Sequence, residues 1–237
     1  MPQFAYDLHI HTCLSPCGDE LMTPPNIANM AYIKGLDLIA VTDHNTALNA
    51  AAVMRAAEEL PLEVIAGIEV TTAEEIHVVC LFPDAESAER AGRELYELLP
   101  PVENNPKFFG EQLVMDENER VLDRLPILLS NATSLSYDEL PSFAARYGGF
   151  CYPAHIDRGT NSVLSNFGML PDRPNFKTLE VYRPDSFFSS SENAEYRRER
   201  KIVTSSDAHQ LGNIAEREHF LELAEPSFEA LKKALCE

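Results

Sequence analysis

Short apolar runs alternate along the chain with segments whose apolar residues recur at helical spacing. Runs rich in β-branched, leucine and aromatic side chains are typical of buried strands, and the intervening stripes are typical of helices that cover them. Because strands and helices alternate, we expect parallel strands joined by crossover helices. The expected strands are 4–9, 36–41, 64–70, 77–82, 127–129, 149–152, 178–182, 202–205 and 219–223.

The helical segments have recognisable ends. Thr23 followed by Pro24 is typical of a helix start, and Gly35 lies where that helix would end. Ser136 and Glu139 have the spacing of a capping box. Apolar stripes that we expect to face the core comprise Ala88, Ala91, Leu95 and Leu98; Leu140, Phe143, Ala144 and Tyr147; and Phe228, Leu231 and Leu235.

Length and composition fit one α/β domain with a sizeable core. The chain has 237 residues, of which 45% are hydrophobic. A helix and strand alternation with about seven or eight strands favours a barrel over an open sheet. The least regular stretch, 102–124, is expected to form a surface excursion or a lid within the domain.

The charge is strongly acidic, with 38 Asp and Glu against 19 Lys and Arg. Such a field repels polyanions, so we expect no binding along duplex nucleic acid, and we expect a small phosphorylated substrate or a short nucleotide end held by local cations. Neither a membrane-length apolar run nor a leader pattern is apparent, so we expect no membrane partner and a cytoplasmic location. The five cysteines are odd in number and are expected to be reduced.

Histidines and carboxylates gather at the carboxyl ends of the expected strands. His9 and His11 are two residues apart on the first strand and therefore point to the same side. His77 begins its strand, and His219 is read as structural. The other groups that follow strands are Asp43 and His44, Glu69, His155, and Asp207 and His209. Parallel α/β barrels build their active sites at this end of the strands, so the pattern predicts a metal site there.

Six short motifs, in order, resemble those of the polymerase and histidinol phosphatase (PHP) superfamily of metal-dependent phosphoesterases. The resemblance spans residues 7 to 209 and implies a distorted (β/α)7 barrel, a single domain over 1–237, with three divalent ions. The motifs are Asp7-Leu8-His9-Ile10-His11, Thr42-Asp43-His44, Gly67-Ile68-Glu69-Val70, His77-Val78-Val79, Pro153-Ala154-His155 and Ser206-Asp207-Ala208-His209.

The resemblance also implies which residues bind each ion. The loop after His11 is about two residues longer than the usual family form, and backward alignment from Thr23-Pro24 selects Asp19 as its ligand, with Glu20 and Cys17 as weaker alternatives. Imidazole and carboxylate donors suit Mn²⁺, Zn²⁺ or Fe²⁺. The implied sets are His9, His11, Glu69 and Asp207 for the first ion; Glu69, His77 and His155 for the second; and His44, His209 and Asp19 for the third.

The implied chemistry is hydrolysis of a phosphate ester by a metal-activated water. No Gly-x-Ser-x-Gly elbow or phosphate-cradling glycine-rich loop points to another mechanism. Arg158 and Arg183 are expected to contact the phosphate, since a guanidinium matches its oxygens, although either could instead form a surface salt bridge. Asp43 is expected to orient a ligand or a bound water.

Three other functions remain open. The first is a 3′-5′ exonuclease or a nucleotide 3′-phosphatase, which the resemblance also allows. The second is a non-catalytic metal-binding module, which the intact set of motifs disfavours. The third is an amidohydrolase, which uses similar ligands on a barrel but fits the order of the motifs less well.

Overall fold

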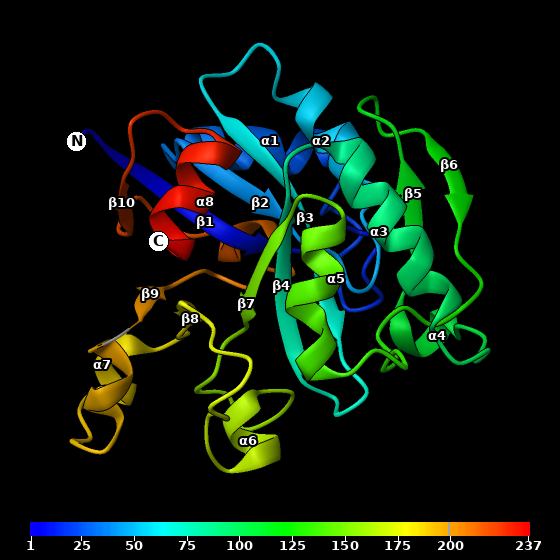
Figure 1. The fold of residues 1–237 in the computed structure, drawn as a ribbon. Coiled ribbons are helices and arrows are strands. Elements are labelled where there is room, and N and C mark those ends of the chain that lie inside the picture. The colour runs from blue at the N-terminus through cyan, green and yellow to red at the C-terminus, as the bar shows by residue number, and fades with distance from the viewer. Residues whose placement is uncertain (199) are drawn as a thin grey trace.

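A six-stranded sheet forms the centre of the molecule (Figure 1). The structure is a computed structural model and describes residues 1–198 and 200–237. The sheet order is β10-β1-β2-β3-β4-β7. Its strands are β1 (Gln3–Ile10), β2 (Leu38–Val41), β3 (Glu63–Thr71), β4 (His77–Phe82), β7 (Phe150–Pro153) and β10 (Phe220–Glu222).

The sheet is mixed, which corrects the expectation of uniformly parallel strands. β1, β2 and β3 run parallel, whereas β3 pairs with β4, β4 with β7, and β1 with β10 in antiparallel fashion. Only residues 72–76 separate β3 from β4, and a parallel crossover needs a dozen residues or more. Thr72 donates its N–H to Ile76 O at 2.9 Å and closes a hairpin there.

The sheet curls into a half-barrel whose open side faces a second, smaller pair of strands. β8 (Thr178–Glu180) and β9 (Lys201–Val203) run parallel to each other. The Ile156 N–H donates to Glu180 O at 2.9 Å, and the His11 N–H donates to Ala208 O at 3.0 Å. The chain after β7 therefore returns to the end of β1, so the two ends of the curled sheet converge on one region.

Alternate residues of the strands point into two separate cores. On β2, Ile39 and Val41 join the core under the helices, while Leu38 and Ala40 join the core on the other face. A fully buried side chain of this kind contributes roughly 1.5 to 3 kcal/mol. The first core is covered by α1 (Pro24–Ile33), α2 (Ala50–Ala56), α3 (Ala85–Glu97) and α5 (Leu140–Arg146), and the second by α8 (Phe228–Cys236).

The expected helix ends and stripes are present. Thr23 is the N-cap of α1 with Pro24 at its first position, and Gly35 follows the helix with φ +71°. Ser136 and Glu139 form the capping box at the single-turn helix η1 (Tyr137–Glu139), which runs directly into α5. Leu98 is half-buried, and Phe228, Leu231 and Leu235 are buried.

The region 102–124 contains structure that the sequence pattern did not predict. A helical turn α4 (Pro106–Phe109) precedes a hairpin of β5 (Leu113–Met115) and β6 (Val121–Arg124). Leu113 donates its N–H to Cys13 O at 3.0 Å, so the hairpin lies against the loop that follows His11. The expected strand at 127–129 is wrong, since Ile127 forms only an isolated bridge with Glu103.

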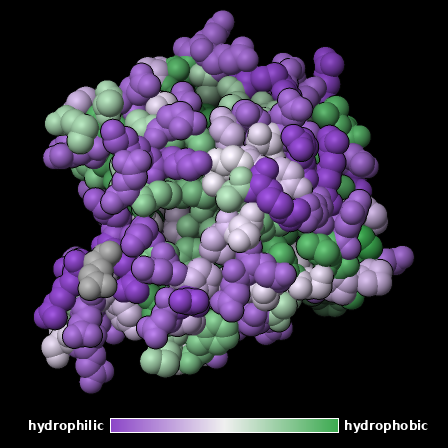
Figure 2. Space-filling model, viewed as in Figure 1, coloured by the Kyte–Doolittle hydropathy of each residue, from purple (hydrophilic) through white to green (hydrophobic). Residues whose placement is uncertain are grey.

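Short helices and loops form the rest of the chain. Figure 2 shows that the viewed face is mostly hydrophilic, with hydrophobic residues gathered at the lower right, where α4 lies in Figure 1. In the described part of the chain, no helix has the length and apolar character needed to span a membrane. The remaining elements are α6 (Val163–Phe167), α7 (Pro184–Phe187), η2 (Asn193–Arg197) and η3 (Leu211–Asn213).

Candidate metal centre

One buried carboxylate lies among five imidazoles. Glu69, near the end of β3, is 1% exposed. Four separate motifs supply the five surrounding rings, and each ring has a nitrogen within reach of a Glu69 oxygen. The distances are 2.8 Å to His77 Nδ1, 3.0 Å to His44 Nδ1, 3.1 Å to His155 Nε2, 3.2 Å to His9 Nε2 and 3.3 Å to His11 Nε2.

A second carboxylate, Asp207, joins the same cluster from the loop after β9. Its Oδ1 lies 3.1 Å from His11 Nε2 and 3.4 Å from His9 Nε2. The backbone of Asp207 has φ +50° and that of His155 has φ +27°, both in the region that L residues rarely adopt. Such strain persists where the surroundings fix the conformation, and it gathers at functional sites.

The two histidines of β1 aim at one point. Their rings are 5.2 Å apart and their Nε2 atoms 3.2 Å apart, and both side chains are fully buried. Glu180 accepts from His9 Nδ1 at 3.1 Å through both of its oxygens. Ser15 Oγ lies 2.9 Å from His11 Nδ1. Each partner holds the ring by Nδ1 and leaves Nε2 directed at the cluster.

Glu180 was missed by the sequence reasoning, although a usable signal exists. It is a fully buried carboxylate on β8, inside an expected strand. Besides holding His9, it accepts the backbone N–H of His155 at 3.2 Å. A carboxylate in a strand that faces a histidine strand end is a candidate for positioning ligands.

Asp43 does not enter the donor cluster, and its contacts are with the loop after β1. Its Oδ1 accepts the Thr12 N–H at 2.7 Å and the Ser15 hydroxyl at 2.6 Å. Through Ser15 this carboxylate fixes the ring of His11. The role that these contacts support is orientation of the loop and one imidazole, without direct contact with the reacting atoms.

Donor atoms of the described residues form three overlapping groups in which all atoms lie within 4.8 Å of one another. Asp19 belongs to none of them. Its side chain is exposed and its Oδ1 accepts the Leu21 N–H at 2.9 Å, and Cys17 takes the place that the sequence reasoning gave to Asp19. The groups are His9, His11, Glu69 and Asp207; His44, Glu69 and His77; and His11, Cys17, His44 and His209.

The cluster fits divalent metal ions. His44 Nδ1, Glu69 Oε2 and Asp207 Oδ1 are buried and, although they lie 3.0 to 3.4 Å from facing nitrogens or oxygens of the cluster, their contacts do not have the geometry of hydrogen bonds. An unpaired buried polar atom costs about 1 to 3 kcal/mol, and several in one place need a shared partner. Imidazole and carboxylate are ligands that divalent transition metals bind.

The carboxylates and imidazoles also shift one another's pKa values. Burial raises the pKa of Glu69, but the charges of His77, His9 and His44 outweigh it and hold the pKa well below its usual value. Burial lowers the pKa of His11, yet its hydrogen bonds to Asp207 and Glu69 raise it to about 9. Burial dominates at His77 and lowers its pKa to about 4.

The Cys17 sulfur lies beside His11, His44 and His209, and Cys17 and His44 shift each other's pKa values. Burial opposes the thiolate, but the charge of His44 and hydrogen bonds with His209 and His44 lower the pKa of Cys17 to about 5. The pKa of His44 is raised well above its usual value; burial opposes this shift, and the Cys17 and Glu69 charges cause it. Both shifts favour a deprotonated sulfur facing these rings.

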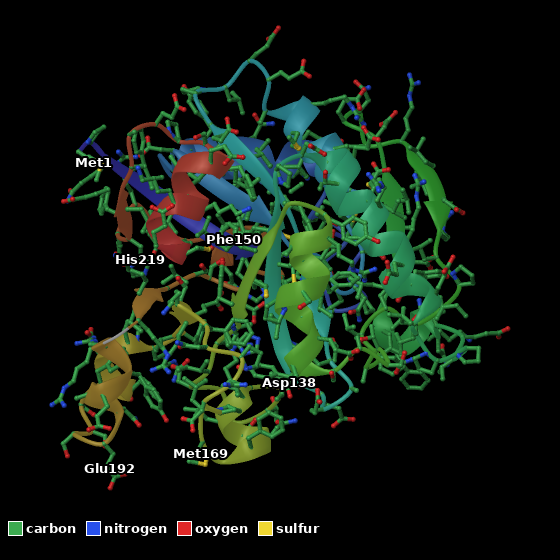
Figure 3. All side chains as sticks on the ribbon, in the orientation of Figure 1. Met1, Asp138, Phe150, Met169, Glu192 and His219 are labelled. Carbon is green, nitrogen blue, oxygen red and sulfur yellow. The ribbon has the colours of Figure 1, made fainter. Side chains whose placement is uncertain are left out.

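Two adjoining cavities open beside the donors. The smaller, about 110 Å³, is lined by His44, Glu69, His77, His155 and Asp207 among others. The larger, about 580 Å³, is lined by Tyr182, Arg183 and His219, the last labelled in Figure 3. Arg158, Asp207 and His209 line both cavities, so the larger one leads to the donors. No residue of 102–124 lines either cavity.

The two expected arginines lie on this path. Arg158 Nη1 lies 2.8 Å from Asp207 Oδ2. Both guanidinium carbons lie over the Tyr182 ring, 4.4 Å from its centre for Arg158 and 5.5 Å for Arg183. Asp157 accepts the backbone N–H groups of Tyr182 and Arg183 at 2.7 Å each and fixes this turn.

Carboxylates and imidazoles that meet at the strand ends of a curled α/β sheet form a cluster that could hold metal ions. The chain matches the PHP domain family over residues 7–159, and it belongs to that family.

Solved structures with related folds include two that cover nearly the whole chain. Endonuclease Q of Pyrococcus furiosus is 20% identical with a TM-score of 0.71, and the match covers 99% of this chain and 56% of that one. A protein described as a metal-dependent phosphoesterase, from Bifidobacterium adolescentis, is 19% identical with a TM-score of 0.64, covering 99% and 96%.

Curated relatives match shorter segments. An uncharacterized protein of Methanocaldococcus jannaschii is 37% identical over 76 residues, 29% of this chain and 44% of its own length. A 5′-3′ exoribonuclease of Haemophilus influenzae is 35% identical over 79 residues, 32% of this chain and 28% of its own. The chain therefore spans less than half the length of these relatives.

The comparisons contradict the expectation of a small phosphorylated substrate or short nucleotide end without duplex nucleic acid. An endonuclease Q structure contains a 27-mer duplex with an abasic lesion, and another relative is named an exoribonuclease. The error came from using the net charge of the whole chain. Residues 157–201 hold eight of the 19 basic and seven of the 38 acidic residues, so the acidity lies elsewhere. At physiological salt, charges more than about 8 Å apart are largely screened from each other. The field near this segment can therefore differ from the acidic field of the rest of the chain.

Proposed function

We propose that this protein is a nuclease, which hydrolyses phosphodiester bonds of a nucleic acid strand at a centre of three divalent ions. The observation that carries the proposal is the position of Asp207. Its Oδ1 faces His9 and His11, while its Oδ2 contacts Arg158 on the wall of the larger cavity. Asp207 and His209 belong to the donor groups and also line this cavity, so the donor cluster adjoins an arginine-bearing groove.

The groove suits a strand. Guanidinium groups of Arg158 and Arg183 match phosphate oxygens in pairs, and the Tyr182 ring between them offers a face on which a base can stack. A cavity of about 580 Å³ is within the range of small-ligand sites and leads directly to the donors. The names of the exoribonuclease and endonuclease relatives support the same substrate class.

We assign one ion to each of the three donor groups, with His155 added to the group of Glu69 and His77 because its Nε2 lies 3.1 Å from Glu69. Divalent ions supply Lewis acidity and a water activated near neutral pH. We also propose that β8 and β9 complete the wall of a distorted barrel, and that 1–237 acts as one domain.

The side chains around the centre hold the metal ligands and orient the phosphate. Glu180 keeps the proton of His9 on Nδ1, so that Nε2 stays a free donor. His209 Nδ1 donates to Asp207 O at 2.8 Å, which leaves its Nε2 as an acceptor. Arg158 and Arg183 fix the phosphate and offset its charge. No side-chain nucleophile is needed.

The test is cleavage of end-labelled RNA and DNA by protein loaded with Mn²⁺ or Zn²⁺. Single strands, duplexes and circular single strands are compared, since only an endonuclease cuts a circle. We expect cleavage that is lost in His9→Ala and kept in Glu222→Gln, whose side chain is exposed on β10 and lines neither cavity. Failure to cleave any nucleic acid, with bound metal measured in the same sample, would refute the proposal.

A further inference from the structure

The loop after β1 places a cysteine where the sequence reasoning expected a carboxylate. Donor atoms of Cys17, His11, His44 and His209 all lie within 4.8 Å of one another. These residues come from three distant parts of the chain, and His11 and His44 also belong to the two groups that contain Glu69. The Cys17 sulfur therefore adjoins the donor groups of the proposed metal centre.

The acidic neighbours of Cys17 do not compete for this position. Asp19 Oδ1 is engaged by the Leu21 N–H. All three side chains are exposed, but Cys17 belongs to a donor group and neither Asp19 nor Glu20 does. Cys13, the other cysteine of the loop, is buried with its Sγ 3.6 Å from Met115 Sδ and belongs to no donor group. Within the described loop, Cys17 is the donor that reaches the histidines.

The loop is built to hold this position. Gly18 packs so closely that a Cβ would lie 2.2 Å from Thr12 O, and its N–H donates to Ser15 O at 2.9 Å. The Asp19 N–H donates to His209 O at 2.9 Å and links the loop to the last histidine. Leu113 of the β5–β6 hairpin donates to Cys13 O from behind. The turn therefore presents Cys17 towards His209.

His44 has a buried ring nitrogen that makes no hydrogen bond. Its side chain is 6% exposed, and its Nδ1 lies 3.0 Å from Glu69 Oε2 without the geometry of a hydrogen bond. Sulfur and imidazole donors gathered around such a group form the kind of set that binds Zn²⁺.

We infer that Cys17 is a metal ligand of this protein and that its sulfur, with His11, His44 and His209, makes one of the three sites a mixed Cys and His site selective for Zn²⁺ or Fe²⁺ over Mn²⁺ and Mg²⁺. Soft thiolate ligands favour the former ions, whereas Mn²⁺ and Mg²⁺ prefer oxygen. The inference rests on the proposed metal centre and assigns the chemistry of one of its sites.

Cobalt substitution tests the sulfur directly. Protein loaded with Co²⁺ is expected to show a near-ultraviolet thiolate-to-cobalt charge-transfer band in the wild type and in Cys13→Ser, and to lose it completely in Cys17→Ser and Cys17→Asp. Retention of the band in Cys17→Ser, or its absence from the wild type with three ions bound, would overturn the inference.

Competition between ions gives a second measurement that does not depend on catalysis. With equal Zn²⁺ and Mn²⁺ present, Cys17→Asp should take up about tenfold more Mn²⁺ relative to Zn²⁺ than the wild type does. An unchanged ratio would count against the inference. A wild type that shows the cobalt band but cleaves no nucleic acid would refute the proposed nuclease function alone.

Discussion

The donor cluster and the segment 157–201 meet at Asp207 but differ in almost every physical property. His9 and His11 are fully buried and Glu69 is 1% exposed, whereas Arg183 is exposed and Arg158 is half-buried. The cluster stands on long strands. Apart from β8, whose Glu180 is buried against His9, the described residues of 157–198 form short helices and loops that extend away from the sheet, and Glu192 and Met169, labelled in Figure 3, lie on their outer parts.

The comparison separates two tasks. A metal site needs donors fixed within a fraction of an ångström, which buried strands and backing carboxylates provide. A strand of nucleic acid needs positive charge and a stacking surface that adapt to its shape. The exposed side of the larger cavity, formed by Arg158, Tyr182 and Arg183 and called the wall below, can provide both. Changes in the cluster should therefore remove metal and activity together, while changes in the wall should weaken substrate binding and leave the metal in place.

The largest effect is expected for Glu69→Gln. An amide cannot offset the charge of several ions or imidazolium groups, and the five imidazoles would lose their shared partner. We expect loss of bound metal and a fall in kcat/KM of about a thousandfold or more, equivalent to several kcal/mol. Metal analysis and cleavage assays on the same sample measure both. Glu63→Gln, at the half-buried start of β3, is the matched control, and full metal content in Glu69→Gln would contradict the expectation.

A smaller effect is expected for Glu180→Gln. The carboxylate touches only the far side of His9 and the His155 N–H, so the ligands remain but their orientation loosens. Outer carboxylates of this kind are worth about 10 to 100-fold in metal affinity. Titration of the metal-free protein should show that loss, and excess metal should restore most of the activity.

Glu222→Gln, exposed on β10, serves as the control for Glu180→Gln. An activity loss that excess metal leaves untouched would mean that Glu180 acts on the substrate rather than on a ligand.

The wall is tested by Arg183→Ala. Loss of one charged contact to phosphate should raise KM by about tenfold. The slope of log KM against log salt concentration should fall by about the amount that one phosphate contact contributes. Bound metal should be unchanged, because Arg183 contacts no member of the donor groups. Arg183→Lys should recover only part of the loss, since an ammonium lacks the planar fork.

Arg124→Ala, exposed on β6, is the control for the wall. Kinetics that are the same for Arg183→Ala and wild type would assign Arg183 to the surface and reject its role in binding.

The same division explains what the sequence could predict. The histidines could be recognised from the sequence because each follows or lies in an apolar run that predicts a strand. The six motifs were sufficient to predict the family, which the family match confirms. The set His9, His11, Glu69 and Asp207 recurs in the structure as one donor group. Strands β1, β3 and β4 were located to within about two residues at either end.

The errors arose where tertiary contacts decide. β4 runs antiparallel because a five-residue link cannot cross the sheet, and the expected strand at 127–129 is absent. The hairpin β5–β6 is stabilised by contacts such as that of Leu113 with Cys13. Counting along the loop selected Asp19, but the tight turn at Gly18 directs Cys17 to the histidines instead. Charge counted over the whole chain hid the balanced segment 157–201.

The smallest expected effect is on the thermal stability of the metal-free protein. Its dependence on pH should come from the donor cluster and not from the wall. His11 has its pKa raised to about 9, so the stabilisation that its charge gives is complete below pH 6.5 and is lost as the pH rises towards 9. Glu69 and Asp207 have lowered pKa values, so their stabilisation is present above about pH 4 and is lost on acidification.

Between pH 6 and pH 9 we therefore expect the Tm of the metal-free protein to fall by about 5 °C in a Cys17→Ser background, since each kcal/mol shifts a chain of this size by a few degrees. The background is needed because the Cys17 thiol, whose pKa is lowered to about 5, would add stability over the same pH range. Bound Zn²⁺ should reverse the trend, because metals displace the protons of their ligands and bind more tightly as the pH rises. The difference in Tm between loaded and metal-free protein should thus widen with pH. His11→Gln should make the Tm of the metal-free protein less dependent on pH. Arg183→Ala should show the same pH dependence as the wild type, because Arg183 does not titrate in this range. A metal-free Tm that stays level or rises from pH 6 to pH 9 would contradict a cluster in which imidazolium groups and carboxylates hold each other in place.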